Sequence, residues 1–320
     1  MDLKKVDGES VQEYEEGRDC MRQFAIVGLG EVLWDIFPTH KQLGGAPANF
    51  TYIAGLLGDE GIVASRIGED DLGREALERF GGLGLSFDHI QRDLEHATGT
   101  GIVEVASDGQ PRFEIIRKVA WDFLEWTADL EALASRADAV CFGTLAQREV
   151  TSRETIQRFV DAVRASAVKV FDVNLRQTFY SPELLAASAS SADILKLNHE
   201  ELPVLLRAVH APHVDDVRAA RWLCGRFALK LVCITRGGNG SLLVTPREQH
   251  EHDGFPVQVV DTVGAGDAFT ATLVHHYLRG SSLAETNEAA NRMGAWVASQ
   301  AGATPAADAE QIQLARARNA

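Results

Sequence analysis

Short apolar runs rich in β-branched residues alternate with longer segments of helical periodicity from Phe24 onward. The runs and the helical segments that follow them are GIVASRI with DLGREALERFGGLG, ADAVCFGTL with SRETIQRFVDAVRASA, VKVFDVN with SPELLAASASSA, and DILKLN with HEELPVLLRAV. The apolar runs predict buried strands, and the three-to-four-residue spacing predicts amphipathic helices. The alternation predicts an α/β fold with a mostly parallel sheet, helices on both faces, and ligands at the carboxyl ends of the strands.

Two segments interrupt this alternation. Residues 98–119 alternate like a hairpin around Asp108 and Gly109, and residues 32–45 are extended without a helical pattern. We expect small strands from these two segments to form a lid over the site.

We expect a polar N-terminal tail followed by one large domain that includes the two lid segments. Residues 1–22 are polar and acidic, so we expect them to be disordered or weakly docked. No Pro- or Ser-rich linker divides residues 23–320, and 45% hydrophobic residues in a chain of 320 suffice for a large core.

Charge and apolar content restrict the partners and the compartment. The 46 acidic and 31 basic side chains give a net charge of -15, which disfavours nucleic acid and anionic membranes as partners. No run approaches ~18 uninterrupted apolar residues, and the N-terminus lacks the apolar segment of a signal peptide, so we expect a cytoplasmic protein. No CxxC pair occurs, which favours reduced cysteines for Cys20, Cys141, Cys224 and Cys233.

The segment VVDTVGAGDAFTATLVHHYLRG at 259–280 is the most informative for chemistry. A strand-like VQVV is followed by a turn of small residues, 264–266, that opens a helix. Unobstructed backbone N–H groups at a helix N-terminus form an anion site. Asp267 then stands at the edge of that site, although a first-turn carboxylate that stabilises the helix dipole explains the residue equally well.

Two polar positions accompany this turn in the N-terminal part of the chain. In GGAPANF, Gly44 and Gly45 permit close approach of the backbone to a ligand, and Asn49 presents an amide that donates and accepts. Asp35 ends an extended run, where a carboxylate accepts hydrogen bonds from sugar hydroxyls or caps a turn. Alone, GGAPANF favours an ordinary turn followed by a helix.

Three further motifs lie in the middle of the chain. In FDVNLR, Asp172, Asn174 and Arg176 occupy alternate positions on one side of a strand, which favours a cleft there. Asn198 and Glu201 are three residues apart at a helix start, a spacing that suits water around Mg²⁺ but that alone favours an N-cap with a capping-box Glu. The turn in VCITRGGNGSLLV lines a nucleotide or closes a hairpin.

Several other kinds of site are excluded or disfavoured. Gly28 and Gly30 follow the first strand, but Leu33 replaces the third glycine of the dinucleotide fingerprint and no helical pattern follows. No GxxxxGK[ST] occurs, which excludes a standard P-loop. No further zinc ligands accompany the histidine pairs His250 with His252 and His275 with His276 in the sequence, so we expect these four side chains to face solvent.

Together these motifs resemble the PfkB, or ribokinase-like, family of carbohydrate kinases. DTVGAGDAF, GGAPAN, the Asn-x-x-Glu and TRGGNGSL occur in the family's order between about Phe24 and about Ala306. The segments GEVLWDIFP, KVAWDFLEW, CFGTLAQR and FDVNLR resemble bacterial fructokinases most closely. The resemblance implies a ribokinase-like three-layer sandwich with a mostly parallel central sheet and a small β-strand lid, ATP as phosphoryl donor, and Mg²⁺.

The resemblance also implies roles for matching residues. Asp267 resembles the family's catalytic base, and Gly264, Ala265 and Gly266 its anion hole. The positions that match sugar-binding residues are Asp35, Gly44, Gly45, Asn49, Asn174 and Arg176. On the nucleotide side the matches are Asn198, Thr235, Arg236, Gly237 and Gly238.

Metal ions are implied in the same way. Glu201 matches the residue that organises Mg²⁺ through water. Some members bind a monovalent cation such as K⁺, for which the ligands here would be Asp261, the carbonyl of Val263, and Gly302.

The resemblance thus implies an ATP-dependent fructokinase. The helix terminus is expected to lower the pKa of Asp267. The open alternatives are a kinase for ribose, a kinase for a sugar acid such as 2-keto-3-deoxygluconate, whose carboxylate Arg148 and Arg176 would hold, and a catalytically silent sugar-binding protein of the same fold. Exposed edges of the lid strands predict a homodimer.

Overall fold

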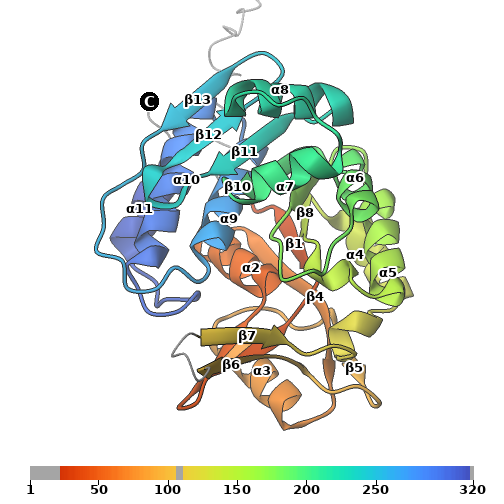
Figure 1. Ribbon diagram of the computed structural model, residues 1–320. Helices are drawn as coiled ribbons and strands as arrows, with labels where there is room; N and C mark the ends of the chain where they lie inside the picture. Colours follow the sequence, from red (N-terminus) through yellow and green to blue (C-terminus); the bar gives the residue numbers. More distant parts are fainter. Residues whose placement is uncertain (1–21, 106–110, 318–320) are drawn as a thin grey trace, which may run out of the picture.

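A nine-stranded sheet forms the centre of the molecule (Figure 1). The computed structural model describes residues 22–105 and 111–317. The sheet order is β13-β12-β11-β10-β9-β8-β1-β4-β5, parallel from β5 to β11 and antiparallel for β12 and β13. The strands are β1 (Ala25–Leu29), β4 (Glu60–Gly68), β5 (Ile90–Asp93), β8 (Ala139–Phe142), β9 (Val168–Asp172), β10 (Ile194–Asn198), β11 (Leu231–Thr235), β12 (Ser241–Val244) and β13 (Gln249–His252). The predicted mostly parallel sheet is confirmed.

Helices cover both faces of this sheet because alternate strand residues point to opposite sides. Val27 of β1 belongs to one buried cluster and Ile26 to the other. The first cluster packs against α4 (Ala128–Arg136), α5 (Val150–Ala162), α6 (Pro182–Ser190), α7 (Glu201–Ala208) and α8 (Asp216–Phe227). The second packs against α2 (Ala46–Leu56), α3 (Asp71–Gly82), α9 (Ala265–Leu278), α10 (Leu283–Ala298) and α11 (Ala309–Arg316). The result is the expected three-layer sandwich.

A second, four-stranded sheet lies apart from the central one (Figure 1). Its order is β3-β2-β6-β7, with bounds Lys41–Gly44, Leu33–Ile36, Gly99–Val105 and Pro111–Ile115. The outer pairs are antiparallel and β2 pairs with β6 in parallel. These strands occupy the two segments expected to form a lid. The turn at Asp108 and Gly109 lies outside the described residues, as does the tail up to residue 21.

The segment VQVV at 257–260, expected to be a strand, is irregular in the structure. Val257, Val259 and Val260 are exposed, and the Val260 N–H donates to the Ala298 carbonyl at 2.9 Å instead of to a strand. The segment follows the edge strand β13 and has no neighbouring strand to pair with, so its β-branched residues are free to line a cavity.

His275 and His276 are buried, which corrects the expectation that they face solvent. The His275 Nδ1 lies 2.6 Å from Asp59 Oδ2, and the Arg279 guanidinium donates to both oxygens of Asp59 at 2.7 and 3.2 Å. The Phe24 N–H also donates to Asp59 at 3.2 Å, so this cluster ties the last turn of α9 to the start of β1. The cysteines at 141, 224 and 233 are buried and free as expected, and Cys20 lies outside the described residues.

Replacing the carboxylate at the centre of this cluster, Asp59→Asn, is expected to lower the free energy of unfolding by about 3 kcal/mol, because it leaves a buried guanidinium without its counter-ion. Burial raises the pKa of Asp59, but the hydrogen bonds from His275 and Arg279 outweigh it and hold the pKa below its usual value. The contribution is therefore present above the unfolded pKa and lost as pH falls through the folded one. Urea denaturation at neutral and acidic pH measures both effects; equal stability of the variant and the parent at pH 7 would contradict them.

None of the described helices combines the length and the apolar character that a bilayer crossing requires.

Candidate active site

A cavity of about 530 Å³ opens between the second sheet and the carboxyl ends of the central strands. The sequence-selected residues that line it are Asp35, Gly44, Gly45, Asn49, Asn174, Arg176, Asn198, Thr235, Val263, Gly264, Gly266 and Asp267. Residues from β2, β3, α2, β10, β11, α9 and the loop after β9 thus converge on one space, although the chain separates them widely. We call it the polar cavity.

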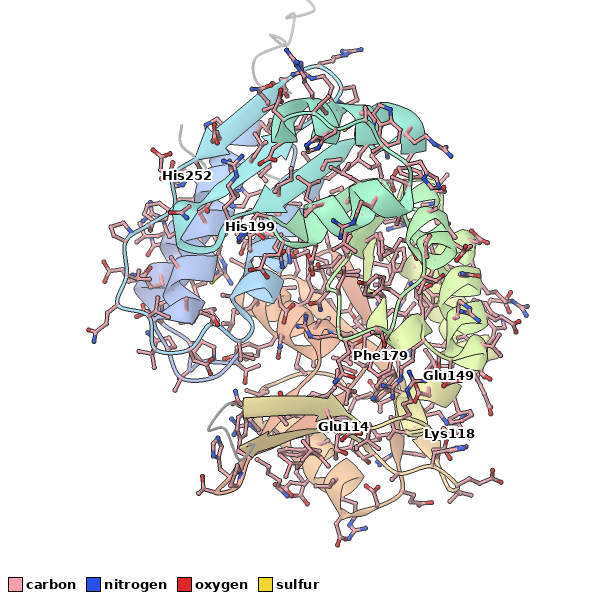
Figure 2. The ribbon with its side chains drawn as sticks, viewed as in Figure 1. Glu114, Lys118, Glu149, Phe179, His199 and His252 are labelled. Atoms are coloured by element: carbon pink, nitrogen blue, oxygen red, sulfur yellow. The ribbon has the colours of Figure 1, made fainter. Side chains whose placement is uncertain are left out.

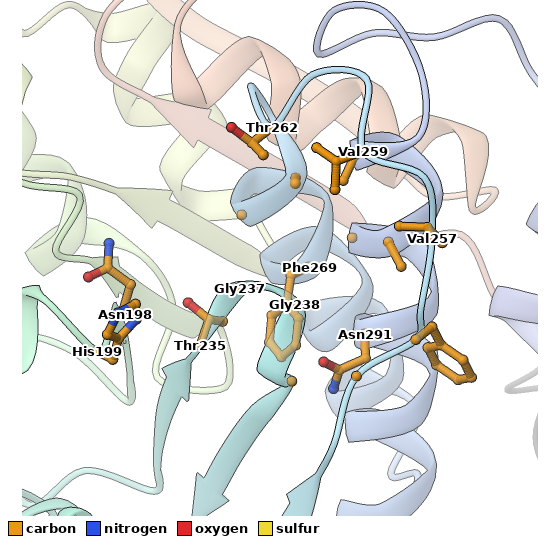
Figure 3. A pocket seen from close by; sticks show the side chains of 18 of the residues that line it. Asn198, His199, Thr235, Gly237, Gly238, Val257, Val259, Thr262, Phe269 and Asn291 are labelled. Atoms are coloured by element: carbon orange, nitrogen blue, oxygen red, sulfur yellow. The ribbon is translucent and has the colours of Figure 1, made fainter.

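A second cavity of about 560 Å³ adjoins the polar cavity. Thr235, Gly237 and Gly238 lie on one side and Val257 and Val259 on the other, with Phe269 between them (Figure 3). Ala265 also lines this space, which we call the apolar cavity. The residues that line both cavities are Asn198, Thr235, Thr262 and Gly266.

The N-terminus of α9 stands at the junction of the two cavities. Its N-cap, Gly264, has a φ of 78°, a left-handed conformation that favours glycine. A Cβ on Gly264 would lie 2.4 Å from the Ala303 Cβ, so the turn has no room for a side chain there. The Ala265 N–H donates to the Thr262 carbonyl at 3.3 Å. The first amides of α9 have no acceptor within the helix and lie at the positive end of the helix dipole, an arrangement that binds anions.

Asp267 projects from this first turn into the polar cavity and is only partly exposed. The Asn49 side-chain amide donates to its Oδ2 at 2.8 Å, which joins the two motifs first selected from the sequence. Burial, and then the neighbouring Asp172 carboxylate, raise the pKa of Asp267 to about 6. The expected lowering by the helix terminus is therefore wrong, because desolvation outweighs it.

Asp35 offers a second carboxylate to the polar cavity. Its Oδ1 is buried without a hydrogen-bond partner, and burial raises the pKa of Asp35 to about 6. A buried acceptor without a donor is costly, so a ligand hydroxyl that donated to it would relieve the cost.

Two charged residues of the polar cavity were not selected from the sequence. Glu31 is 4% exposed, and burial raises its pKa to about 7 although Arg176 opposes the shift. Lys196 pairs with Asp172, its Nζ lying 3.0 and 3.1 Å from the two carboxylate oxygens. Each stands inside an apolar run, GLGEVL or ILKLN, and a lone charge in a buried strand is the signal that would have selected it.

Other sequence-selected residues lie outside both cavities. The Arg236 guanidinium pairs with Asp216 and Glu251. The Glu201 carboxylate accepts from the N–H groups of Leu175 and Asn198, at 2.8 Å each. The Asn198 Oδ1 accepts in turn from the Glu201 N–H at 2.9 Å, which is the capping-box arrangement.

Asp261 and Gly302 also lie away from the cavities and contact each other. Asp261 accepts from the Gly302 N–H at 3.1 Å and from the Val263 N–H at 3.0 Å, which fixes the loop before α9. Within residues 22–105 and 111–317, no group of three or more His, Cys, Asp or Glu side chains is arranged to hold a metal ion.

Arg148 cannot serve the polar cavity because it is buried elsewhere. Its guanidinium donates to both oxygens of Asp122 at 2.7 Å and packs between the rings of Trp121 and Phe179. This junction between the central domain and the second sheet lies where Figure 2 labels Phe179 and Lys118. Arg148 is therefore a structural residue, and the expectation that it holds a ligand carboxylate is wrong.

Comparison with known proteins places this geometry among sugar kinases. The sequence profile described as "pfkB family carbohydrate kinase" matches residues 19–310. Fructokinase-1 of Oryza sativa subsp. japonica is 28% identical, covering 90% of this chain and 96% of its own. Aminoimidazole riboside kinase of Salmonella typhimurium is 29% identical, covering 87% and 90%. The crystal structure of a fructokinase with bound ATP from Xylella fastidiosa superposes with a TM-score of 0.80 at 24% identity, covering 90% and 97%.

Proposed function

Since the chain belongs to the pfkB family of carbohydrate kinases, which are phosphotransferases with a sugar hydroxyl as acceptor, we propose that it is a fructokinase. It would transfer the γ-phosphoryl group of ATP to a hydroxyl of fructose. The observation that carries this proposal is the junction at the start of α9. Gly264 and Asp267 line the polar cavity there, Ala265 lines the apolar cavity, and Gly266 lines both.

The roles at this junction follow from the charge that phosphoryl transfer develops. Negative charge is spread over the transferring oxygens, which positioned N–H groups at the start of α9 would stabilise. Asp267 would orient the acceptor hydroxyl and take its proton, and Asn49 holds the carboxylate in place. Asp35 would accept a hydrogen bond from a second sugar hydroxyl, consistent with its unpartnered buried Oδ1.

The charge of the polar cavity favours a neutral sugar. Three carboxyl groups line it, Glu31, Asp35 and Asp267, against the two cations Arg176 and Lys196, the latter already paired with Asp172. A sugar acid or sugar phosphate would bring further negative charge beside these carboxylates. Arg148 is also engaged elsewhere, which weakens the sugar-acid alternative.

ATP and Mg²⁺ are the proposed cofactors. The apolar cavity suits a purine because Phe269, Val257 and Val259 line it, and Ala265 and Gly266 at the start of α9 line it too. The absence of an acidic cage among the described residues suits Mg²⁺, which is typically carried by the nucleotide's phosphates with several waters. Glu201 would act on the ion only through water, because both of its oxygens accept backbone N–H groups. The ion would neutralise charge on the phosphates.

A monovalent cation beside the anion hole stays a proposal. Asp261 and Gly302 bracket the loop that ends at Gly264, so an ion bound there would stabilise the turn. Homodimer formation through the outer strands β3 and β7 also stays a prediction from the sequence.

The experiment is a coupled ADP-release assay of the full chain with Mg²⁺ and ATP, with and without K⁺. The acceptors are fructose, ribose, glucose, mannose, 2-keto-3-deoxygluconate and aminoimidazole riboside. We expect fructose to have the highest kcat/KM, by about tenfold or more over the other neutral sugars, because cavity contacts discriminate by 1–3 kcal/mol.

The possible outcomes separate the alternatives. A higher kcat/KM for aminoimidazole riboside than for fructose would identify aminoimidazole riboside as the substrate instead. This acceptor is included because a 29% identical relative is an aminoimidazole riboside kinase. Preference for 2-keto-3-deoxygluconate would contradict the charge argument. Absence of turnover with every acceptor, together with calorimetric binding of a sugar, would identify a silent sugar-binding protein.

A further inference from the structure

Lys196 is a buried cation at the point where the two strands β9 and β10 end beneath α9. Its side chain is 8% exposed, and it lines the polar cavity together with Gly266 and Asp267. A lysine so deeply buried is retained only where its charge is paired or used.

The position of the ammonium is fixed from three elements. Asp172 at the end of β9 accepts from the Lys196 Nζ at 3.0 and 3.1 Å. The Thr270 hydroxyl of α9 lies 3.2 Å from Asp172 Oδ2 and 2.9 Å from the Gly266 carbonyl. The ion pair is therefore tied to the same helix turn that carries the anion-binding amides.

The geometry leaves the ammonium able to contact a ligand. An ammonium has three N–H donors, and Asp172 is the partner of Lys196 in the structure. A Cβ on Gly266 would lie 3.2 Å from the Lys196 Nζ, so the absence of a side chain at 266 keeps the ammonium close to the junction.

We propose that the Lys196 ammonium donates a hydrogen bond to the transferring phosphoryl group, alongside the amides of α9, and that Asp172 is its positioning residue. The inference rests on the proposed function. The bond from the phosphorus to the β,γ-bridging oxygen of ATP breaks, the bond to the sugar oxygen forms, and the hydroxyl proton passes to Asp267. Lys196 keeps its three protons throughout, and its coulombic attraction to the phosphoryl oxygens increases as negative charge develops on them.

The same ion pair also biases Asp267. The charged groups that face Asp267 are Glu31, Asp172, Lys196 and Arg176, and Asn49 donates to it. Asp172 raises the pKa of Asp267 and Lys196 lowers it. Removing either partner should therefore shift the acid limb of kcat/KM, in opposite directions.

The test uses Lys196→Met, Asp172→Asn and the double variant. The double variant removes both charges, so it avoids an unpaired buried carboxylate if Lys196→Met fails to fold. Lys230→Met is the matched control, because Lys230 also pairs with an aspartate, Asp193, but at a half-exposed position outside both cavities.

We expect Lys196→Met and the double variant to lower kcat about 100-fold with little change in either KM, as for loss of one transition-state donor. The acid limb should move to higher pH in Lys196→Met and to lower pH in Asp172→Asn. Lys230→Met should match the parent.

A binding measurement separates phosphoryl contact from a purely structural role. Calorimetry of ADP with Mg²⁺, fluoride, aluminium and fructose mimics the transferring group. The parent should bind ADP more tightly with aluminium fluoride than without it. In the double variant this increase in affinity should be about tenfold smaller, while the affinity for ADP alone is unchanged.

An undiminished gain in the double variant would overturn the role of Lys196. If the parent itself shows no fructose turnover and no gain from aluminium fluoride, the proposed function fails instead, so the two failures are distinguishable.

Discussion

Asp267→Asn is expected to lower kcat for fructose about 1000-fold, within the range that loss of a general base produces, while ATP binding stays close to that of the parent. The amide has almost the same shape and its oxygen can still accept from Asn49, but it cannot take the hydroxyl proton. The measurement is steady-state turnover by ADP release, paired with calorimetry of ATP binding.

The fold of this variant should be intact. Burial raises the pKa of Asp267, so the ionised carboxylate is less stable in this cavity than in water, and a neutral amide removes that cost. Asp71→Asn is the matched control, because Asp71 also lies in the first turn of a helix, α3, but faces solvent. It should lose only the dipole interaction and an exposed ion pair with Arg74, together about 0.3–1 kcal/mol of stability. Near-parental turnover of Asp267→Asn would contradict the role of Asp267 as a base and leave it only the helix-dipole role that Asp71 has.

The pH profile of the parent follows from the same residue. In the proposed mechanism the ionised form of Asp267 is the base. Its pKa is raised to about 6, so kcat/KM should fall about tenfold per pH unit below that value. A carboxylate at its ordinary pKa would place this limb about two units lower. The absence of an acid limb between pH 5 and 7 would contradict the burial that the structure shows.

The sequence predicts the large features of the fold because they depend on local patterns. Apolar runs such as VKVFDVN and the helical periods that follow them correspond to β9 and α6 in the structure, and the extended segments at 32–45 and 98–119 carry the second sheet. Those local patterns do not show whether another strand lies beside a given run to pair with it. The VQVV run has a strand-like composition, yet it lies beyond an edge strand with nothing to pair with.

The candidate site was predicted where its residues form contiguous motifs, such as GAGD, and missed where they are single charges. Lys196 and Glu31 stand alone in apolar strands, and only the packing of β1, β9, β10 and α9 brings them together. Arg148 illustrates the opposite error, since a cation near a sugar motif is held by Asp122, Trp121 and Phe179 away from the cavity. Spacing along the chain determines local geometry, whereas partners across the sheet depend on tertiary structure.

Gly264→Ala is expected to lower kcat about 100-fold by displacing the turn whose amides we propose to bind the transferring phosphoryl group. The added Cβ would lie 2.4 Å from the Ala303 Cβ and 2.7 Å from its Cα, and the φ of 78° is strained for alanine. The turn must shift to relieve these contacts, which would move its amides away from their proposed position around the transferring phosphoryl group. Loss of one such donor costs about 100- to 1000-fold in kcat.

The control for this substitution is Gly225→Ala in α8, where nothing lies within 4 Å of the added Cβ. It should keep full activity and gain about 0.5–1 kcal/mol of stability from reduced chain entropy. Circular dichroism melting and turnover of both variants are the measurements. Gly264→Ala displaces the amides proposed to contact the transferring group, so it should also weaken the aluminium fluoride complex. Asp267→Asn leaves those amides in place and should retain the complex. Parental kcat in Gly264→Ala would show that the amides of 264–266 do not bind the transferring phosphoryl group.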